Sequence, residues 1–309
     1  VYKRQGETLF LKEVFPGVPI LSYCEFYYHG HGADVNFDPE FPSDFDTLCR
    51  LRIRNAQHLL ALELADRGIS PTQWHKSQFP SALSDKIEVI HDGIDCEHVC
   101  PDPIAQVRLP DDTVLRAGDE VLVFIARNLE LYRGFHVFMR ALPELLDLRP
   151  EAQVVVIGGD EAGYGRSAPE GTTWRESLLS EVGPLPDRVH FVGKLPYAQY
   201  LKIQQVAAAR IYLSYPFVLS WSLLESMAAG CLVIGSRTPP VEEVIQDGVN
   251  GRLVNFFDAS EIARTTAEVL AERNSLEDMR AAARQTILDQ YDWHDCRRRL
   301  LGLMSELTD

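Results

Sequence analysis

Two arginines stand where a predicted strand ends and a predicted helix begins. Arg127 follows the apolar strand 121–126, and Arg133 precedes the helical pattern that opens at Gly134. A guanidinium group holds a phosphate in a bidentate fork, so two arginines six residues apart at one sheet edge suit a diphosphate. Without an anion, an arginine at a helix start opposes the helix dipole. The alternative is that both are solvated loop residues, and these two residues alone do not decide.

A second anion-binding feature is the stretch 213–235, which predicts a strand, a loop after Pro216, a helix over 222–229 and a return strand. The unpaired amide groups in the first turn of such a helix favour a phosphate. Glu225 in this helix has two interpretations. Either it accepts hydrogen bonds from a pair of sugar hydroxyls beside the phosphate, or it completes a capping box by bonding back to the amide of Ser222.

Strands and helices alternate through the second half of the chain, which predicts a parallel sheet with right-handed crossovers. Because open α/β sheets bind ligands beyond the carboxyl ends of their strands, the arginines and Glu225 are expected at one edge. The expected strands are 121–126, 153–157, 189–192, 210–214, 232–235 and 251–254. The expected helices are 134–148, 173–182, 197–208, 222–229, 239–246, 259–272, 275–289 and 293–307.

The first hundred residues carry a shorter α/β pattern. We expect a helix that ends at Pro16-Gly17, strands at 18–23 and 87–90, and a helix from about Phe45 with leucines at helical spacing. The stretch 60–64 fits either a strand or a continuation of that helix. Residues 70–80 are interpreted as a loop with one short helix.

No metal site is predicted. Asp44-Phe-Asp46 has the spacing of a metal-binding Asp-x-Asp motif, but Ser43 and the two carboxylates are better explained as caps of the helix that begins there. The Cys-x-His-x-Cys cluster at 96–100 lacks the second pair that a zinc site needs. The 6 cysteines show no disulfide spacing, and reduced thiols in the cytoplasm are expected.

Length and charge limit the classes of partner. At 309 residues the chain exceeds one ordinary core, so two domains are expected. The net charge of −15 argues against nucleic acid and against non-specific docking to anionic lipid. The sequence has no apolar run long enough for a transmembrane segment. A local basic patch leaves a peripheral membrane contact open, so the inner face of the membrane is the alternative to a free cytoplasmic location.

Four stretches resemble the retaining glycosyltransferases of family 4, which have the GT-B fold. The resemblance spans nearly the whole chain and implies two Rossmann-like domains with parallel sheets facing a cleft. It implies transfer of a sugar from a nucleoside-diphosphate sugar to an acceptor hydroxyl, with retention and without a metal. The stretches are Arg127…Arg133-Gly134, Phe191-Val-Gly-Lys-Leu-Pro, Leu224-Glu225-Ser-Met-Ala-Ala-Gly-Cys, and His91-Asp-Gly-Ile-Asp, which is similar to a Pro-Asn-Gly-Val-Asp turn.

The resemblance also implies roles for individual residues. Arg127 and Arg133 would hold the diphosphate, with Arg133 standing where a lysine is usual, and Glu225 would bind the ribose hydroxyls. No cofactor is implied beyond the nucleotide-sugar co-substrate, and the acceptor would be a sugar or a glycolipid-type molecule. The remaining donor contacts would be the backbone of Lys194 and Leu195 beside the base, and amides at Ser220, Trp221, Ser222 and Leu223 beside the phosphates.

Three departures from the family affect the donor sugar. Phe217 stands where the family commonly has a second glutamate, and residues 218–220 replace Gly-Phe-Gly, so donor-sugar recognition must differ. Glu25 aligns with the family's first-domain histidine and joins the two arginines as a catalytic candidate. His29 or His31 could reach in from the adjoining loop instead, or could be solvated loop residues.

The expected domains are a partial N-terminal, acceptor-side Rossmann-like domain at 1–105 and a Pro/Asp-rich linker at 106–120. A C-terminal nucleotide-sugar-binding domain follows at 121–288, and a helix at 289–309 is expected to pack back toward the first domain. A full Rossmann-like half needs roughly 150 residues, and the family's glycine-rich first strand is absent. An N-terminally truncated piece is therefore expected, with the basic start Val-Tyr-Lys-Arg-Gln as a truncated reading frame or a foreign scar.

Three rival functions remain. A non-catalytic or inactive nucleotide-sugar-binding fragment gains support from Phe217 and Glu25. A GT-B-like nucleotide-sugar epimerase would use the same donor but needs carboxylates at the sugar carbon. A hydride-transferring dehydrogenase is disfavoured, because the glycine-rich stretch 158–165 is not the strand–G-x-G-x-x-G–helix element.

Overall fold

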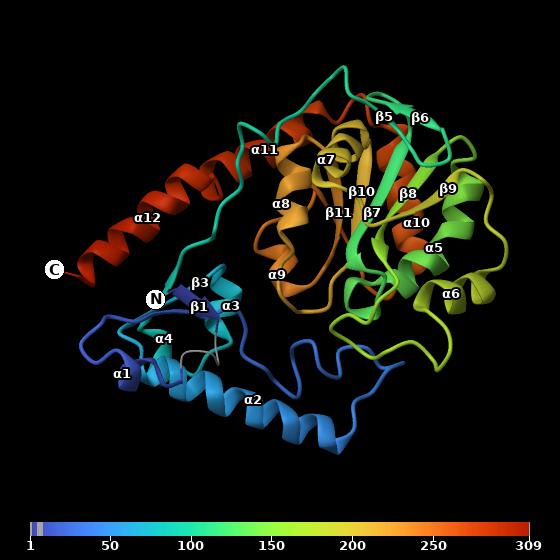
Figure 1. Cartoon of the computed structure of the whole chain (residues 1–309). Helices are drawn as coiled ribbons and strands as arrows, with labels where there is room; N and C mark the ends of the chain where they lie inside the picture. The colour runs from blue at the N-terminus through green and yellow to red at the C-terminus, as the bar shows by residue number, and fades with distance from the viewer. Residues whose placement is uncertain (1, 5–8, 309) are drawn as a thin grey trace. The chain divides into compact units, whose positions relative to one another are not determined.

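The computed structural model describes residues 2–4 and 9–308, and the chain divides into two compact units (Figure 1). The first unit contains the residues up to Asp95 together with Tyr215–Val218 and the residues from Tyr291 onward. The second unit contains Cys96–Ser214 and Leu219–Gln290. None of the helices in the described residues is both long and apolar enough to cross a membrane.

The first unit is built on a parallel four-stranded sheet in the order β1-β2-β3-β4. The strands are β1 (Tyr2–Arg4), β2 (Leu21–Tyr23), β3 (Arg67–Ser70) and β4 (Ile87–Val89). The helices are α1 (Leu11–Val14), α2 (Phe45–Leu64), α3 (Gln73–Ser77), α4 (Ser81–Ser84) and, from the end of the chain, α12 (Trp293–Glu306).

Several expectations for this unit need correction. Of the basic start, which was expected as a truncated reading frame or a foreign scar, Tyr2–Arg4 form β1 and pair with β2. The stretch 60–64 continues α2, which settles the choice between strand and helix. The sequence missed β3, because Arg67 and Gly68 interrupt its short apolar run. The expected strand 18–23 is shorter, since Pro19 offers no amide hydrogen for the ladder.

The start of α2 confirms the capping interpretation of the Asp-x-Asp motif. Asp44 is the N-cap, and its Oδ1 accepts hydrogen bonds from the Thr47 amide at 2.8 Å and from the Thr47 hydroxyl at 2.6 Å. Over residues 2–4 and 9–308, no group of three or more His, Cys, Asp or Glu residues is arranged to hold a metal ion.

Both faces of the first sheet are covered by apolar side chains. One cluster joins the sheet to α2 through Leu62 and Ala65, and the other joins it to α12 through Leu303. Arg299 of α12 also donates a hydrogen bond to the Val89 carbonyl at 2.6 Å. The final helix therefore folds as part of the first unit.

The second unit contains a parallel six-stranded sheet in the order β12-β11-β10-β7-β8-β9. The strands are β7 (Val121–Asn128), β8 (Gln153–Gly159), β9 (Val189–Gly193), β10 (Ala209–Tyr212), β11 (Leu232–Ser236) and β12 (Arg252–Val254). All six predicted strands are confirmed, with ends shifted by one to two residues. This order is that of a Rossmann fold, which reverses direction between β7 and β10.

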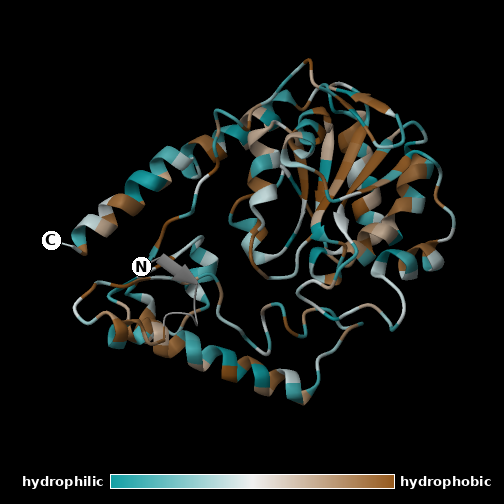
Figure 2. Cartoon of the chain, viewed as in Figure 1, coloured by the Kyte–Doolittle hydropathy of each residue, from teal (hydrophilic) through white to brown (hydrophobic). Residues whose placement is uncertain are grey.

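Helices surround this sheet, whose strands are mostly apolar (Figure 2). The helix expected at 239–246 is only four residues long, because it ends at Glu242. The helical elements are η1 (Leu131–Arg133), α5 (Phe135–Leu148), α6 (Trp174–Val182), α7 (Tyr197–Val206), α8 (Trp221–Ala228), α9 (Pro239–Glu242), α10 (Ala259–Ala271) and α11 (Glu277–Gln290).

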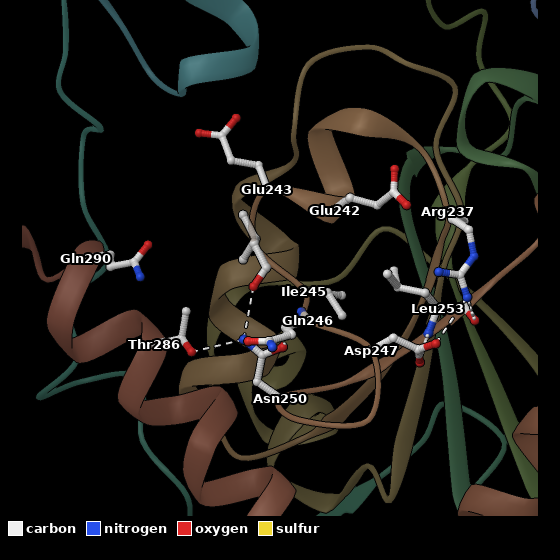
Figure 3. A pocket seen from close by; sticks show the side chains of 11 residues that line it. Arg237, Glu242, Glu243, Ile245, Gln246, Asp247, Asn250, Leu253, Thr286 and Gln290 are labelled. Atoms are coloured by element: carbon white, nitrogen blue, oxygen red, sulfur yellow. Dashed lines mark hydrogen bonds and ion pairs between the residues drawn. The ribbon is translucent and has the colours of Figure 1, made fainter.

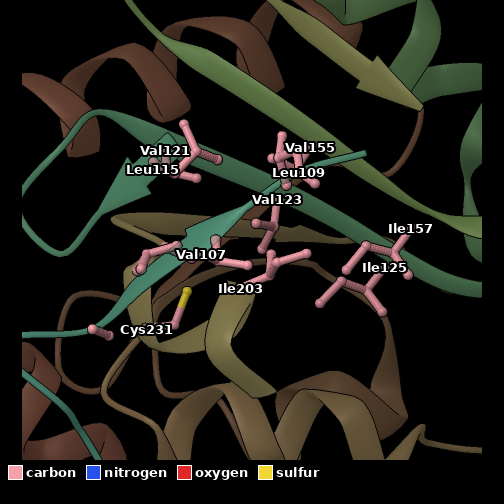
Figure 4. Close-up of a cluster of buried hydrophobic side chains, with 13 residues drawn as sticks. Val107, Leu109, Leu115, Val121, Val123, Ile125, Val155, Ile157, Ile203 and Cys231 are labelled. Carbon is pink, nitrogen blue, oxygen red and sulfur yellow. The ribbon is translucent and has the colours of Figure 1, made fainter. Parts of the chain in front are cut away.

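The segment expected as a linker, 106–120, contains an antiparallel hairpin of β5 (Gln106–Arg108) and β6 (Val114–Arg116). Val107 and Leu115 of the hairpin are buried in a cluster with Val123 and Ile203 of the second unit (Figure 4). Its Pro and Asp residues occupy the turns, so composition alone concealed the two strands. Residues 106–120 are thus a structural part of the second unit.

Candidate functional site

The reversal of strand order brings two loops together at the carboxyl ends of β7 and β10. The turn η1 follows β7, and the segment that leads into α8 follows β10. Gly134, at the start of α5, has φ of 67°, and a β-carbon there would collide with the Leu213 side chain. Only glycine therefore allows the start of α5 to approach the end of β10 this closely.

Arg133 connects the two loops. Its Nη1 donates hydrogen bonds to Ser214 Oγ at 3.0 Å and to the Tyr212 hydroxyl at 3.3 Å. The same Tyr212 oxygen accepts a hydrogen bond from the Ser220 amide at 2.9 Å. One phenol thus links the Arg133 guanidinium to the start of α8.

Arg127 is less constrained. It lies near the end of β7 and is exposed, and its side chain makes no hydrogen bond or ion pair with any residue that the structure describes. The geometry therefore connects Arg133 with the α8 turn and leaves Arg127 as a solvated arginine on the strand that precedes it.

The first turn of α8 differs from the predicted one. The N-cap is Ser220, not Ser222, and Ser220 Oγ accepts from the Ser222 amide at 3.3 Å. The Leu223 amide donates to the Ser220 carbonyl at 3.0 Å, and the Leu223 side chain is buried. Trp221 is 51% exposed. A phosphate at this turn would replace or share bonds that Ser220 now accepts.

Glu225 does not form the capping box. Its Oε1 accepts a hydrogen bond from the Tyr197 hydroxyl at 2.8 Å, and its Oε2 accepts one from the Tyr200 hydroxyl at 2.5 Å. Burial, and then the charge of Glu225, raise the pKa of Tyr200, so that phenol stays protonated and donates. Two hydroxyls on one carboxylate reproduce the bonding pattern that a ribose diol would offer.

Lys194 and Leu195 lie between β9 and α7. Lys194 Nζ pairs with Glu161 at 2.8 Å, which ties this turn to the glycine-rich loop after β8. Leu195 packs partly buried against the apolar cluster that contains the hairpin. The two residues and the loop after β8 thus lie at the carboxyl edge of neighbouring strands.

Sequence reasoning missed Glu130, which lies between the two arginines in the chain. Its side chain is buried, with 4% of the residue exposed, and Oε2 accepts from the amides of Tyr164 at 2.5 Å and Gly165 at 3.4 Å. Burial raises the pKa of Glu130, although those two amides and Arg133 oppose the shift. Glu130 therefore fixes the glycine-rich loop beside Arg133. In the sequence, the signal for this role was the position of an acidic residue between two arginines.

Glu25 and Phe217 belong to the first unit. Glu25 follows β2 by two residues and is partly buried. Phe217 is buried, with its ring 4.9 Å from that of Phe26 in an edge-on contact. His29 Nε2 is 2.9 Å from the Gln78 carbonyl oxygen, and His31 is exposed. Phe217 thus contributes to packing in this unit.

A separate cavity of about 530 Å³ in the second unit contains none of the predicted donor-binding residues. Figure 3 shows its polar groups bonded to one another: Asn250 Nδ2 donates to the Val244 carbonyl and to Thr286, and Arg237 pairs with Asp247 at 3.1 Å. These polar groups are therefore already paired within the protein.

Comparison with known proteins identifies the family. A family model described as "Glycosyl transferases group 1" matches residues 109–286, and one described as "Glycosyl transferase family 4 group" matches residues 2–99. The chain belongs to the group 1 glycosyl transferases. The expected GT-B class of fold, with two Rossmann-like α/β units, is confirmed.

Two curated relatives illustrate the similarity. The D-inositol 3-phosphate glycosyltransferase of Thermobifida fusca is 27% identical over 241 residues, which is 75% of this chain and 52% of that protein. The GDP-mannose-dependent alpha-(1-6)-phosphatidylinositol monomannoside mannosyltransferase of Mycolicibacterium smegmatis is 24% identical over 253 residues, 76% of this chain and 60% of that protein. The chain thus spans little more than half the length of these relatives.

Solved structures support the same fold. Sucrose-phosphate synthase from Thermosynechococcus elongatus aligns with a TM-score of 0.75 at 19% identity, covering 99% of this chain and 73% of that one. HepE of Anabaena in complex with UDP-glucose aligns with a TM-score of 0.72 at 17% identity, covering 99% and 78%. At these identities the likeness concerns the fold.

Glu130→Gln tests the buried carboxyl group. A raised pKa in the folded state means that the folded protein binds more protons than the unfolded one between the two pKa values, so stability falls as pH rises through that window. We expect the free energy of unfolding of the parent, relative to Glu130→Gln, to decrease from pH 4 to pH 7 in urea titrations. A difference that stays constant or increases with pH would contradict the buried-acid assignment.

Proposed function

We propose that this chain acts in the transfer of a sugar from a nucleoside-diphosphate sugar to an acceptor hydroxyl, with retention and without a metal. The observation that carries the proposal is the bonding of Arg133 to Tyr212 and Ser214 where the strand order reverses, beside the start of α8. A helix N-terminus and a guanidinium group at such an edge suit a phosphate.

The diphosphate is assigned to Arg133, to Arg127 and to the backbone around Ser220, Trp221, Ser222 and Leu223. As the bond between the anomeric carbon and the diphosphate oxygen breaks, the diphosphate keeps the electron pair and gains negative charge. The acceptor oxygen forms the new bond on the same face of the sugar, and its proton passes to the diphosphate. Groups already placed around the diphosphate stabilise its charge without a metal.

The nucleoside is assigned to Glu225, Lys194 and Leu195. The ribose hydroxyls would take over the oxygens of Glu225 that the Tyr197 and Tyr200 hydroxyls now occupy. The exchange conserves the number of hydrogen bonds on the carboxylate, and the displaced tyrosine hydroxyls need new acceptors, which the ribose oxygens supply in this proposal.

The first unit is assigned to the acceptor side, with Glu25 as a catalytic candidate. The relatives' names support a polar or lipid-linked acceptor, since one is named for inositol 3-phosphate and another for a phosphatidylinositol mannoside. We therefore propose a sugar or glycolipid-type acceptor, and a cytoplasmic protein that meets such a lipid at the membrane's inner face.

A second candidate is donor binding without turnover. It is favoured by Phe217, which replaces the family's second glutamate and is buried against Phe26. Calorimetry with UDP-glucose and GDP-mannose, followed by detection of released UDP or GDP with a glycolipid extract as acceptor, separates the two. Binding with turnover supports transfer, and binding without turnover supports the second candidate.

Metal independence is tested in the same assay. Because Arg133 and the helix-end amides replace the metal in this proposal, we expect release of the nucleoside diphosphate to continue at an unchanged rate in excess EDTA. Loss of the activity in EDTA and its return on addition of Mn²⁺ would overturn this part of the proposal.

Arg133→Ala tests the diphosphate site. Charge-assisted hydrogen bonds are worth about 1.5–3 kcal/mol each, so we expect UDP or GDP to bind at least tenfold more weakly by calorimetry, and more weakly still with Arg127→Ala added. The matched control is Arg264→Ala, which removes an exposed arginine paired with Glu144 at 3.0 Å. Equal affinities in the double variant Arg127→Ala/Arg133→Ala and the control would remove both arginines from the site.

Glu225→Gln tests ribose recognition. The neutral amide keeps one acceptor but weakens the bonds to a diol, so the preference for UDP or GDP over its 2′-deoxy form should fall about tenfold. Thermal melting should change little, since the amide oxygen still accepts from one tyrosine hydroxyl and the amide nitrogen donates to the other. A lowered melting temperature with an unchanged preference would assign Glu225 a purely structural role.

A further inference from the structure

Arg210 is fully buried in the middle of the second sheet. Its exposure is 0%, and among the residues that the structure describes it is one of the largest fully buried side chains. It lies on β10, paired with Val123 of β7 on one side and with Val233 of β11 on the other. Arg210 is thus a charged residue on one of the two strands between which the sheet order reverses.

The guanidinium group contacts the first turn of α8. Nη1 donates to the Ser222 carbonyl and to Ser226 Oγ at 2.7 Å, and Nη2 donates to Ser222 Oγ at 2.8 Å. Nη2 also donates to the Ile125 carbonyl at 3.2 Å, and the guanidinium carbon lies 5.2 Å from the centre of the Tyr212 ring. Arg210 therefore ties β7, β10 and α8 together.

Arg210 forms no direct ion pair with an Asp or Glu of the described part of the chain, and its Nε has no hydrogen-bond partner there. Burial lowers the pKa of Arg210, and the groups that oppose this shift are Tyr200, Tyr212, Cys231 and Glu225. An unpaired buried charge is costly, and a cation near a helix N-terminus adds to that cost.

A short chain of hydrogen bonds leads from Arg210 to Arg133. Ser222 Oγ lies 2.8 Å from Ser220 Oγ, and the Ser220 amide bonds to the Tyr212 hydroxyl that Arg133 also contacts. Two guanidinium groups and a helix N-terminus thus converge on the same loop. An anion bound there would offset the unfavourable interaction among all three.

We propose that Arg210 is a positioning residue of the donor site: it fixes Ser222 in the first turn of α8 and supplies positive charge that favours a diphosphate there. This inference rests on the proposed function. Arg210 itself touches no ligand, because it is covered by the strands and by α8. The competing explanation is a purely structural tie between the sheet and the helix.

The test compares Arg210→Met, which keeps the bulk of the side chain without its charge, with Arg210→Lys, which keeps the charge. The matched control is Arg284→Met, since Arg284 also bonds backbone carbonyls and contacts Ala228 at the opposite end of α8. Calorimetry measures the affinity of the full 309-residue chain for UDP and GDP and for the uncharged uridine and guanosine.

We expect Arg210→Met to bind the diphosphate at least tenfold more weakly than the parent while nucleoside affinity changes less than threefold. Arg210→Lys should keep the ratio of the two affinities within threefold of the parent value, and Arg284→Met should leave it unchanged. A structural tie alone predicts that both affinities fall together. Equal losses, or no loss of diphosphate affinity, in Arg210→Met would overturn the inference.

If Arg210→Met does not fold, Arg210→Gln takes its place, because the amide keeps polar contacts to Ser222 without the charge. A diphosphate affinity reduced at least tenfold with a nucleoside affinity changed less than threefold supports the inference, and any smaller difference between the two losses overturns it. A parent chain that binds neither UDP nor GDP would overturn the proposed function and this inference with it. Parent binding with an unaffected Arg210→Met overturns the inference alone.

Discussion

The main constraint on the second unit is that it holds two arginines close to the first turn of α8, where their positive charges repel each other. Arg133 reaches the start of α8 through Tyr212, and Arg210 reaches it from within the sheet through Ser222. The helix N-terminus adds its own partial positive charge. The fold keeps these groups together because Gly134 allows α5 to start against Leu213 and because apolar strands enclose Arg210 on both sides.

The second sheet was predictable from sequence because its strands are continuous apolar runs separated by helical periods. The order that places β7 beside β10 follows from the crossover rules once these elements are known. The first unit was harder. Its strands have three or four residues. In β3 the polar Arg67 and the glycine Gly68 interrupt the apolar pattern, so this inner strand is recognised only by its pairing with β2 and β4.

The site was predictable only in part. Arg133 stands out by its place before a helix, but the partners of Glu225 come from α7, about 25 residues earlier in the chain. No local motif connects the two helices. The N-cap is Ser220 and not Ser222 for a similar reason, because the Ser222 hydroxyl accepts a hydrogen bond from Arg210. No sequence pattern marks a buried arginine. Long-range polar contacts decided each of these cases.

The pair of phenols on Glu225 has an electrostatic consequence for an incoming nucleotide. A bare carboxylate next to a diphosphate would repel it, because both carry negative charge. Tyr197 and Tyr200 each donate a hydrogen bond to one oxygen of Glu225, and these bonds partly offset the negative charge of the carboxylate. These hydrogen bonds therefore reduce the repulsion between Glu225 and a diphosphate. In a molecule with a net charge of −15, such local hydrogen bonding limits how far one carboxylate repels an anion beside it.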